Sequence, residues 1–154
     1  MAAEDLPFED EWEDASSFEN SPILLVEDRG DDVFLIRRAL DNARLITPIQ
    51  VVSDGEQAIA YLNGDGKFAD RSKYPMPELM LLDIKMPRID GFEVLRWMGQ
   101  QPHLSGIRII VLTSSEDIRD VNLAYQLGAH EFLVKPLKPE RFLHTLRSMK
   151  IYHI

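Results

Sequence analysis

The sequence contains no cysteine among its 154 residues. This absence excludes a disulfide scaffold, a thiolate zinc site and a cysteine nucleophile, and it suits a reducing cytosol. Long apolar runs are missing too, because runs such as 23–26 and 79–82 are far shorter than a membrane-spanning helix. The first residues have neither the basic region nor the apolar stretch of a signal peptide. We therefore expect a cytoplasmic protein, and the chain length suits a single domain.

Basic residues are absent from positions 1–22, although this segment holds eight of the 26 acidic residues. The other 132 residues are nearly neutral, with 18 acids and 17 bases. A block of negative charge repels nucleic acids and anionic membranes, so we expect neither as a partner. The composition predicts an acidic N-terminal extension over residues 1–21 and a folded domain over residues 22–154.

Apolar residues within the acidic segment predict that it docks on a surface rather than only solvating the protein. They are Leu6, Phe8, Trp12 and Phe18. The basic C-terminal region from Lys135 to Ile154, with five bases and one acid, is the expected counterpart. A disordered tail is the alternative that this composition also allows.

From Ser21 onward, short apolar runs alternate with amphipathic stretches. The runs predict strands at 23–26, 49–52, 78–82, 107–112 and 131–134. The stretches predict helices at 31–40, 55–62, 92–98, 118–125 and 139–149, with a long loop at 63–77. Continuous apolar strands separated by helices indicate an α/β fold, with a parallel sheet that helices cover on both faces.

The spacing of apolar residues locates the last two predicted helices. Ile118, Val121, Ala124 and Tyr125 mark the helix at 118–125, which Gly128 ends. The buried stripe of the last helix is expected to contain Phe142, Leu143, Leu146 and Met149.

Polar residues lie where four of the predicted strands end. They are Glu27 and Asp28, then Asp83, Thr113 and Lys135. Each alone is explained by a helix cap or by the end of a strand. Ligands of parallel sheets, however, bind beyond the carboxyl ends of the strands, so the combined set predicts a site at this edge.

Three neighbouring carboxylates repel one another unless a cation lies between them. Oxygen ligands select a hard cation such as Mg²⁺, which takes only one or two carboxylates and keeps several waters. With Mg²⁺ and the Lys135 ammonium nearby, Asp83 can stay ionised and attack phosphorus as a nucleophile. Lys135 and the Thr113 hydroxyl would help to neutralise the phosphoryl oxygens.

The same residues lie in stretches that resemble response-regulator receiver domains of two-component signalling, over about residues 22–152. The matching stretches are Leu25–Asp28, Leu82–Pro87 with Asp90-Gly91, Leu112–Ser114 and Lys135-Pro136. The resemblance implies a flavodoxin-like, doubly wound sheet of five parallel strands in the order 2-1-3-4-5. The long loop at 63–77 further resembles a subgroup of stand-alone regulators associated with phytochromes.

Individual roles follow from this resemblance. It makes Asp83 the phosphoacceptor, and it makes the carboxylates of Glu27, Asp28 and Asp83 and the backbone carbonyl of Lys85 the Mg²⁺ ligands. It makes Thr113 the switch hydroxyl and Lys135 the conserved-type lysine. Phe132 occupies the aromatic switch position, where Tyr is common, and Lys85 and Ser115 occupy tuning positions. The resemblance also implies that the Lys85 side chain projects toward the phosphoryl group.

The expected partners are a sensor histidine kinase, of phytochrome type in the subgroup, or a phosphotransfer protein, and a downstream protein target. A homodimer through the fourth and fifth helices is common in the family. The chain ends just after its last helix, so we expect no output domain. Two alternatives are a non-phosphorylated pseudo-receiver and a Mg²⁺-dependent phosphohydrolase. The phosphohydrolase would need an aspartate where Lys85 stands.

Overall fold

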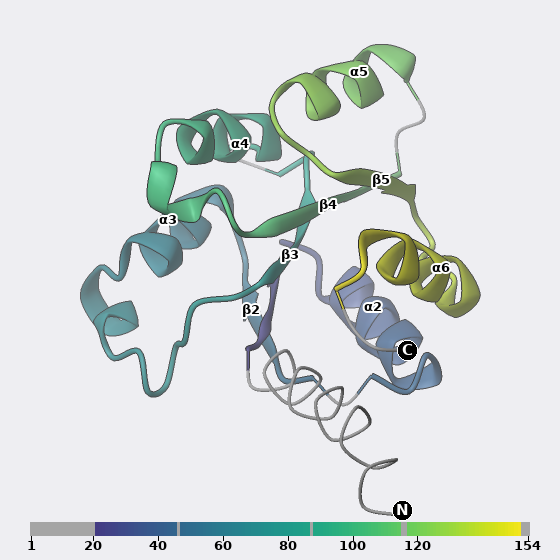
Figure 1. Ribbon diagram of the computed structural model, residues 1–154, viewed down its shortest axis with the longest axis horizontal. Helices are drawn as coiled ribbons and strands as arrows, with labels where there is room; N and C mark the ends of the chain where they lie inside the picture. The colour runs from purple at the N-terminus through teal and green to yellow at the C-terminus, as the bar shows by residue number, and fades with distance from the viewer. Residues whose placement is uncertain (1–20, 46, 87, 115–116, 152–154) are drawn as a thin grey trace, which may run out of the picture.

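A computed structural model of the chain describes residues 21–45, 47–86, 88–114 and 117–151. Five strands form one parallel sheet in the order β2-β1-β3-β4-β5, which confirms the predicted fold (Figure 1). The strands are β1 (Ile23–Val26), β2 (Ile49–Val52), β3 (Leu79–Asp83), β4 (Arg108–Thr113) and β5 (Glu131–Val134). Residues 1–20 of the predicted acidic extension lie outside the described residues.

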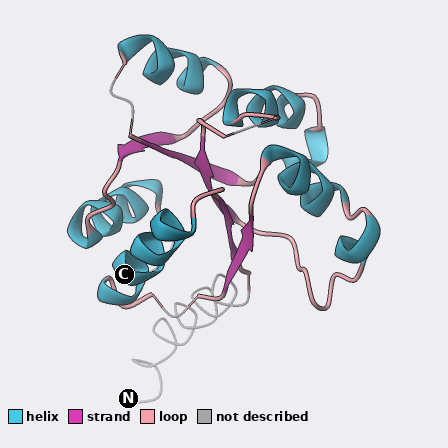
Figure 2. Ribbon diagram, turned by 180° about the vertical axis from the view of Figure 1, so that it is seen from behind, coloured by secondary structure: helices cyan, strands magenta, loops and turns pink. Residues whose placement is uncertain are grey.

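Helices cover both faces of the sheet (Figure 2). The helices α2 (Gly30–Asn42) and α6 (Pro139–Met149) pack on one face. The other face carries α3 (Gly55–Asn63), α4 (Gly91–Gly99) and α5 (Ile118–Gln126). Two short 3₁₀ helices, η1 (Gly66–Ala69) and η2 (Pro102–Leu104), complete the described elements. Among the described helices, none has the length and apolar character needed to span a bilayer.

The core has two layers because successive strand residues face opposite sides of the sheet. In β3, Leu79 and Leu81 pack with residues of α2 and α6, whereas Met80 and Leu82 pack with residues of α3, α4 and α5. All four side chains are fully buried. The most apolar predicted strand therefore lies at the centre of the sheet, as burial on both faces requires.

The predicted loop at 63–77 is packed rather than loose. It contains η1, and the rings of Tyr61, Phe68 and Tyr74 contact one another with centroids 5.1–6.0 Å apart. The Arg71 guanidinium donates hydrogen bonds to the carbonyls of Tyr61 (2.7 Å) and Leu62 (3.1 Å), near the end of α3. The Tyr61 carbonyl also accepts a hydrogen bond from the Gly64 amide (3.2 Å), and Arg71 adds a side-chain donor at this helix end, which holds the loop against α3.

The helix α5 forms where predicted, and the buried stripe predicted for α6 is wrong in part. In α5 only Ala124 is buried, while Ile118 and Tyr125 are 66% and 44% exposed. In α6 the polar residue Thr145 is buried, because its hydroxyl donates a hydrogen bond to the Arg141 carbonyl (3.0 Å). The spacing of apolar residues located these helices. It could not show that a hydroxyl such as that of Thr145 is buried when it bonds to a carbonyl of its own helix. Leu143 and Met149 are only half-buried.

The turn after β3 fixes the position of Asp83. The Asp90 carboxylate caps α4 by accepting a hydrogen bond from the Glu93 amide (3.0 Å). The Gly91 amide donates to the Ile84 carbonyl (3.1 Å). A Cβ atom at Gly91 would lie 2.7 Å from the Asp83 carbonyl oxygen, so only glycine allows this approach. The Asp90-Gly91 pair thus holds the backbone that carries Asp83.

Candidate functional site

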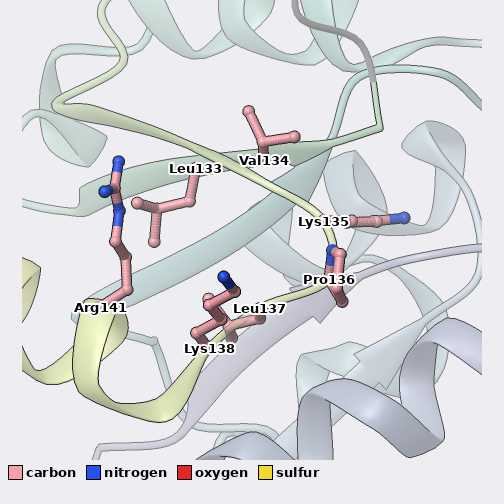
Figure 3. Close-up of a pocket in the computed structure, with 7 residues that line it drawn as sticks. All are labelled: Leu133, Val134, Lys135, Pro136, Leu137, Lys138 and Arg141. Atoms are coloured by element: carbon pink, nitrogen blue, oxygen red, sulfur yellow. The ribbon is translucent and has the colours of Figure 1, made fainter.

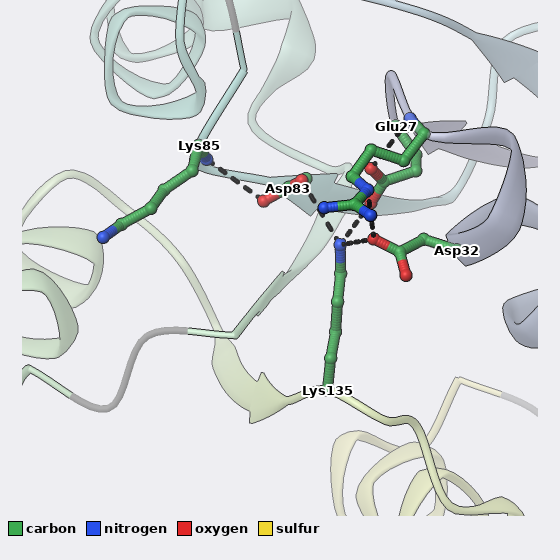
Figure 4. A network of polar contacts seen from close by, with 6 residues as sticks. Glu27, Asp32, Asp83, Lys85 and Lys135 are labelled. Atoms are coloured by element: carbon green, nitrogen blue, oxygen red, sulfur yellow. Dashed lines mark hydrogen bonds and ion pairs between the residues drawn. The ribbon is translucent and has the colours of Figure 1, made fainter.

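The sheet brings the predicted polar residues to one edge. Val26 pairs with Leu82, Asp83 with Leu112 and Thr113 with Val134, so the carboxyl ends of four strands are in register. The Lys135 ammonium lies 2.6 Å from Glu27 Oε2 and 3.3 Å from Asp83 Oδ2 (Figure 4). Thr113 is fully buried, and its carbonyl accepts a hydrogen bond from the Lys135 amide (2.8 Å). Residues more than a hundred positions apart therefore meet at this edge.

One member of the site was not predicted from the sequence. Asp32 Oδ2 lies 2.8 Å from Lys135 Nζ, which is closer than Asp83 (Figure 4). Asp32 belongs to the first turn of α2, directly after Asp31. Acidic residues are common in this position because a negative charge near the start of a helix interacts favourably with the helix dipole. Nothing in the sequence distinguished Asp32 from Asp31, so only the three-dimensional structure could separate their roles.

Both buried carboxylates have a second partner. Glu27 Oε1 accepts a hydrogen bond from the Arg29 amide (3.2 Å), and Asp83 Oδ1 accepts one from the Lys85 amide (3.0 Å). Their other oxygens, Oε2 and Oδ2, receive the Lys135 ammonium. All four oxygens are therefore bonded, which satisfies the polar groups that burial takes from water.

The site perturbs the pKa of both Glu27 and Lys135. Burial raises the pKa of Glu27 to about 7, although the hydrogen bond from Lys135 opposes this change. Burial alone would lower the pKa of Lys135, but hydrogen bonds to Asp32 and Glu27 and the charge of Asp83 outweigh it and raise that pKa to about 12. Lys135 is therefore a permanent cation in a cluster that carries an excess of negative charge.

The carboxylates can hold a hard divalent cation. Oxygens of Glu27, Asp28 and Asp83 lie within 4.8 Å of one another. Glu27 and Asp83 are buried, whereas Asp28 is exposed to solvent. This all-oxygen set with one solvent-facing member fits Mg²⁺, which binds few carboxylates and retains water. The cation would also reduce the repulsion among these acids.

The structure corrects the expected orientation of the Lys85 side chain. Its ammonium lies 3.9 Å from Asp120 Oδ2 on α5, and the side chain is 61% exposed. Figure 4 shows it pointing away from Asp83. The ammonium lies toward the Asp120 carboxylate on α5 instead of facing Asp83, and the action of this side chain on a phosphoryl group stays a prediction. Of the polar groups of Lys85, the backbone amide is the one that donates a hydrogen bond to Asp83.

Two further predicted positions have different outcomes. Phe132 lies on β5 opposite Val111 and packs half-buried against the core, and its role as a switch stays a prediction. Ser115 lies outside the described residues.

A pocket of about 290 Å³ adjoins the other side of the β5–α6 connection (Figure 3). Its lining consists of Leu133, Val134, Lys135, Pro136, Leu137, Lys138 and Arg141. In Figure 3 the Lys135 side chain extends away from Arg141. The Lys135 ammonium therefore belongs to the carboxylate cluster, while Lys138 and Arg141 give the pocket its positive charge.

Comparison with known proteins identifies the family of this site. The model of the response regulator receiver domain matches residues 23–147. The chain belongs to the response regulator receiver domain family. The acidic pair, the central aspartate and the lysine at the edge of the sheet therefore lie within a receiver domain of two-component signalling.

Two curated proteins are similar over most of the chain. The probable methanogenesis regulatory protein FilR2 of Methanothrix harundinacea is 34% identical, with 84% of this chain and 81% of that protein covered. The response regulator Rcp1 of Synechocystis is 36% identical, with 73% of this chain and 75% of that protein covered. The receiver domain therefore occurs in relatives of similar length.

Solved structures point to regulators associated with phytochromes. The bacteriophytochrome response regulator RtBRR is 37% identical with a TM-score of 0.78, covering 88% of this chain and 81% of that one. The phosphorylated cyanobacterial phytochrome response regulator RcpA is 31% identical with a TM-score of 0.71, covering 85% and 91%. The Mn²⁺-bound form of Rcp1 is 31% identical with a TM-score of 0.72, covering 87% and 96%. These relatives agree with the subgroup that the loop at 63–77 predicted.

Proposed function

We propose that this protein is a phosphoacceptor response regulator that receives a phosphoryl group on Asp83 and thereby changes its affinity for a protein partner. The observation that carries this proposal is the contact between the Lys135 ammonium and the buried carboxylates of Glu27 and Asp83. A cation fixed beside a carboxylate favours its ionised form and can also face a phosphoryl group. The phosphorylated form of its relative RcpA supports the same chemistry.

The reaction needs little beyond positioning and charge. An oxygen of Asp83 attacks the phosphorus of a phosphohistidine, the phosphorus–nitrogen bond breaks, and the imidazole leaves with the electron pair. Glu27, Asp28 and Asp83 would hold Mg²⁺, together with the backbone carbonyl of Lys85, and the bound Mg²⁺ would neutralise phosphoryl oxygens. The Mn²⁺-bound form of Rcp1 supports a divalent cation in this family.

The residues of the chain supply the remaining neutralisation. The Lys135 ammonium is within reach of any group carried by Asp83, since it already lies 3.3 Å from that carboxylate. The hydroxyl of Thr113, at the end of the neighbouring strand β4, would donate to another phosphoryl oxygen and couple it to Phe132 on β5. The phosphoryl donor would be a sensor histidine kinase, of phytochrome type as in the relatives, or a phosphotransfer protein.

A phosphohydrolase remains the alternative from another functional class. It would need a general acid two residues after the nucleophile. That residue is Lys85, whose side chain points toward Asp120 and away from Asp83. The orientation therefore favours a stable phosphoacceptor over an enzyme with turnover.

Incubation with Mg²⁺ and acetyl phosphate, followed by intact mass measurement, tests the proposal. We expect one phosphoryl adduct. We expect no adduct when Mg²⁺ is chelated before acetyl phosphate is added. Release of inorganic phosphate without an adduct would instead indicate a phosphohydrolase. The absence of both adduct and turnover would indicate a pseudo-receiver.

A further inference from the structure

The Lys135 ammonium has three N–H groups, and three carboxylates surround it. The distances from Nζ are 2.6 Å to Glu27, 2.8 Å to Asp32 and 3.3 Å to Asp83. The Lys135 side chain is only 12% exposed, so water has little access to the ammonium and cannot easily take the place of a carboxylate. Its position therefore depends on the balance among three negative partners.

Asp32 differs from the other two partners because it is not among the expected metal ligands. Within the described part of the chain, the carboxylates that could hold a metal ion together are those of Glu27, Asp28 and Asp83. A metal ion held by these three residues would bind oxygens of Glu27 and Asp83, the same carboxylates that contact the Lys135 ammonium. Two neighbouring cations repel, and Asp32 is the partner of Lys135 that the metal would leave in place.

We propose that Asp32 is a positioning residue that anchors the Lys135 ammonium so that Mg²⁺ can bind Glu27 and Asp83 while Lys135 stays at the site. The inference rests on the proposed function only for the identity of the metal. Without Asp32, the ammonium depends on Glu27 and Asp83 alone and competes more strongly with Mg²⁺ for their oxygens. Asp32 thus tunes metal affinity without being a ligand.

A purely helical role for Asp32 is the competing explanation. Asp31 and Asp32 both lie in the first turn of α2, where a carboxylate interacts favourably with the helix dipole. Asp31 is exposed, however, whereas Asp32 is only 23% exposed and contacts Lys135. Arg29 Nε also approaches Asp32 Oδ2, at 3.9 Å, but its side chain is 69% exposed. An exposed pair of this length contributes little.

Asp32→Asn and its matched control Asp31→Asn test the proposal through Mg²⁺ affinity, measured by calorimetric titration. Each variant removes one negative charge from the same helical turn, so the effects of the helix dipole and of distant charge are closely matched. We expect Asp32→Asn to weaken Mg²⁺ binding at least about threefold more than Asp31→Asn does, the size of a weak coupling between neighbouring groups. Equal affinities of the two variants would overturn the proposal.

A double-mutant cycle shows whether the effect passes through Lys135. In a Lys135→Met background, which removes the ammonium but retains an unbranched chain, we expect the difference between the two variants to disappear. A difference of unchanged size would mean that Asp32 acts on the metal directly, and it would overturn the anchoring role. Asp32→Glu is a second test, which does not depend on the folding of the Lys135→Met protein. It keeps the negative charge, so its Mg²⁺ affinity should be close to that of the wild type and higher than that of Asp32→Asn.

The outcome is separable from that of the proposed function, because calorimetry needs no phosphoryl transfer. A phosphoryl adduct on the wild-type protein together with equal Mg²⁺ affinities would retain the function and reject the role of Asp32. The expected affinity difference without any adduct would support the role of Asp32 and reject the function. Thermal unfolding of the metal-free variants verifies that each one is folded.

Discussion

At the scale of single residues, the site depends on a buried acid and a buried base that stabilise each other unequally. Three carboxylates stabilise the charged form of Lys135, so its pKa rises to about 12 although burial alone would lower it. Glu27 has one strong cationic partner and a negative neighbour in Asp83, so burial prevails and its pKa rises to about 7. The ionisation of Glu27 is therefore the step in this cluster that physiological pH controls.

We predict that Mg²⁺ affinity increases as the pH rises through about 7. Glu27 must be ionised to bind a cation, and metal binding therefore competes with its proton. Below its pKa the affinity should change by up to about tenfold per pH unit. Calorimetric titrations between pH 6 and pH 8 measure this dependence. Glu27→Gln does not titrate, and an equally steep dependence in that variant would assign the proton to another group.

The stability of the metal-free protein should depend on pH in the opposite sense. Between pH 4.5 and about pH 7, folded Glu27 holds a proton that the unfolded chain has released. The free energy of unfolding should therefore fall as the pH rises through this window. Chemical denaturation of the wild type and of Glu27→Gln measures the contribution of this group. Identical pH profiles for the two proteins would show that Glu27 keeps its ordinary pKa of 4.5.

At the scale of elements, the turn between β3 and α4 determines where the phosphoacceptor lies. Gly91 packs its α-carbon against the backbone of Ile84 and Asp83, and a Cβ atom there would lie 2.6 Å from the Ile84 Cα. These are backbone atoms at the end of β3 and the start of the turn, and moving them costs more free energy than moving the end of a flexible side chain. The turn is therefore built around a glycine that must have no side chain.

Gly91→Ala should lower the free energy of unfolding by about 1–3 kcal/mol, the usual cost of overpacking. Gly99→Ala is a matched control in the same helix, since a Cβ atom at Gly99 meets nothing within 4 Å. Alanine is favoured over glycine in helices, so this control should be neutral or slightly stabilising. Urea unfolding of both variants provides the comparison. Equal stability of the two would contradict the close packing at Gly91.

The sequence predicted most of these elements because their signals are local. The five strands and five main helices lie within a few residues of the expected ranges, and the strand ends identified Glu27, Asp83 and Lys135. Three features depended on tertiary structure instead. Asp32 reaches Lys135 only after α2 packs beside α6, Lys85 turns toward Asp120 on α5, and α5 leaves Ile118 exposed. Periodicity contains no information about such partners.

At the scale of the whole molecule, charge is divided between the acidic segment 1–22 and a basic C-terminal region. Lys138 and Arg141 line the pocket beside the β5–α6 connection, together with apolar side chains such as Val134. An acidic segment with aromatic residues is complementary to such a surface, and its aromatic anchors would supply most of the affinity. Docking of this segment, and the boundary of the folded domain at residue 22, stay predictions.

Removal of residues 1–20 should change the association state or the partner affinity of the protein, because the deletion would uncover this surface. Sedimentation of the full and truncated chains measures association. In the full chain, Trp12 should show blue-shifted fluorescence, recorded in a Trp97→Phe background that removes the second tryptophan. Solvent-like Trp12 emission together with unchanged association would instead describe a disordered tail.

The most direct test of the whole account locates the phosphoryl group. Wild-type protein, Asp83→Asn and the control Asp31→Asn are incubated with Mg²⁺ and acetyl phosphate, and each intact mass is measured. Asparagine keeps the volume of the side chain but lacks a nucleophilic oxygen anion. We expect one adduct on the wild type and on Asp31→Asn, and none on Asp83→Asn. An adduct of equal yield on Asp83→Asn would contradict the assignment of Asp83 as the phosphoacceptor.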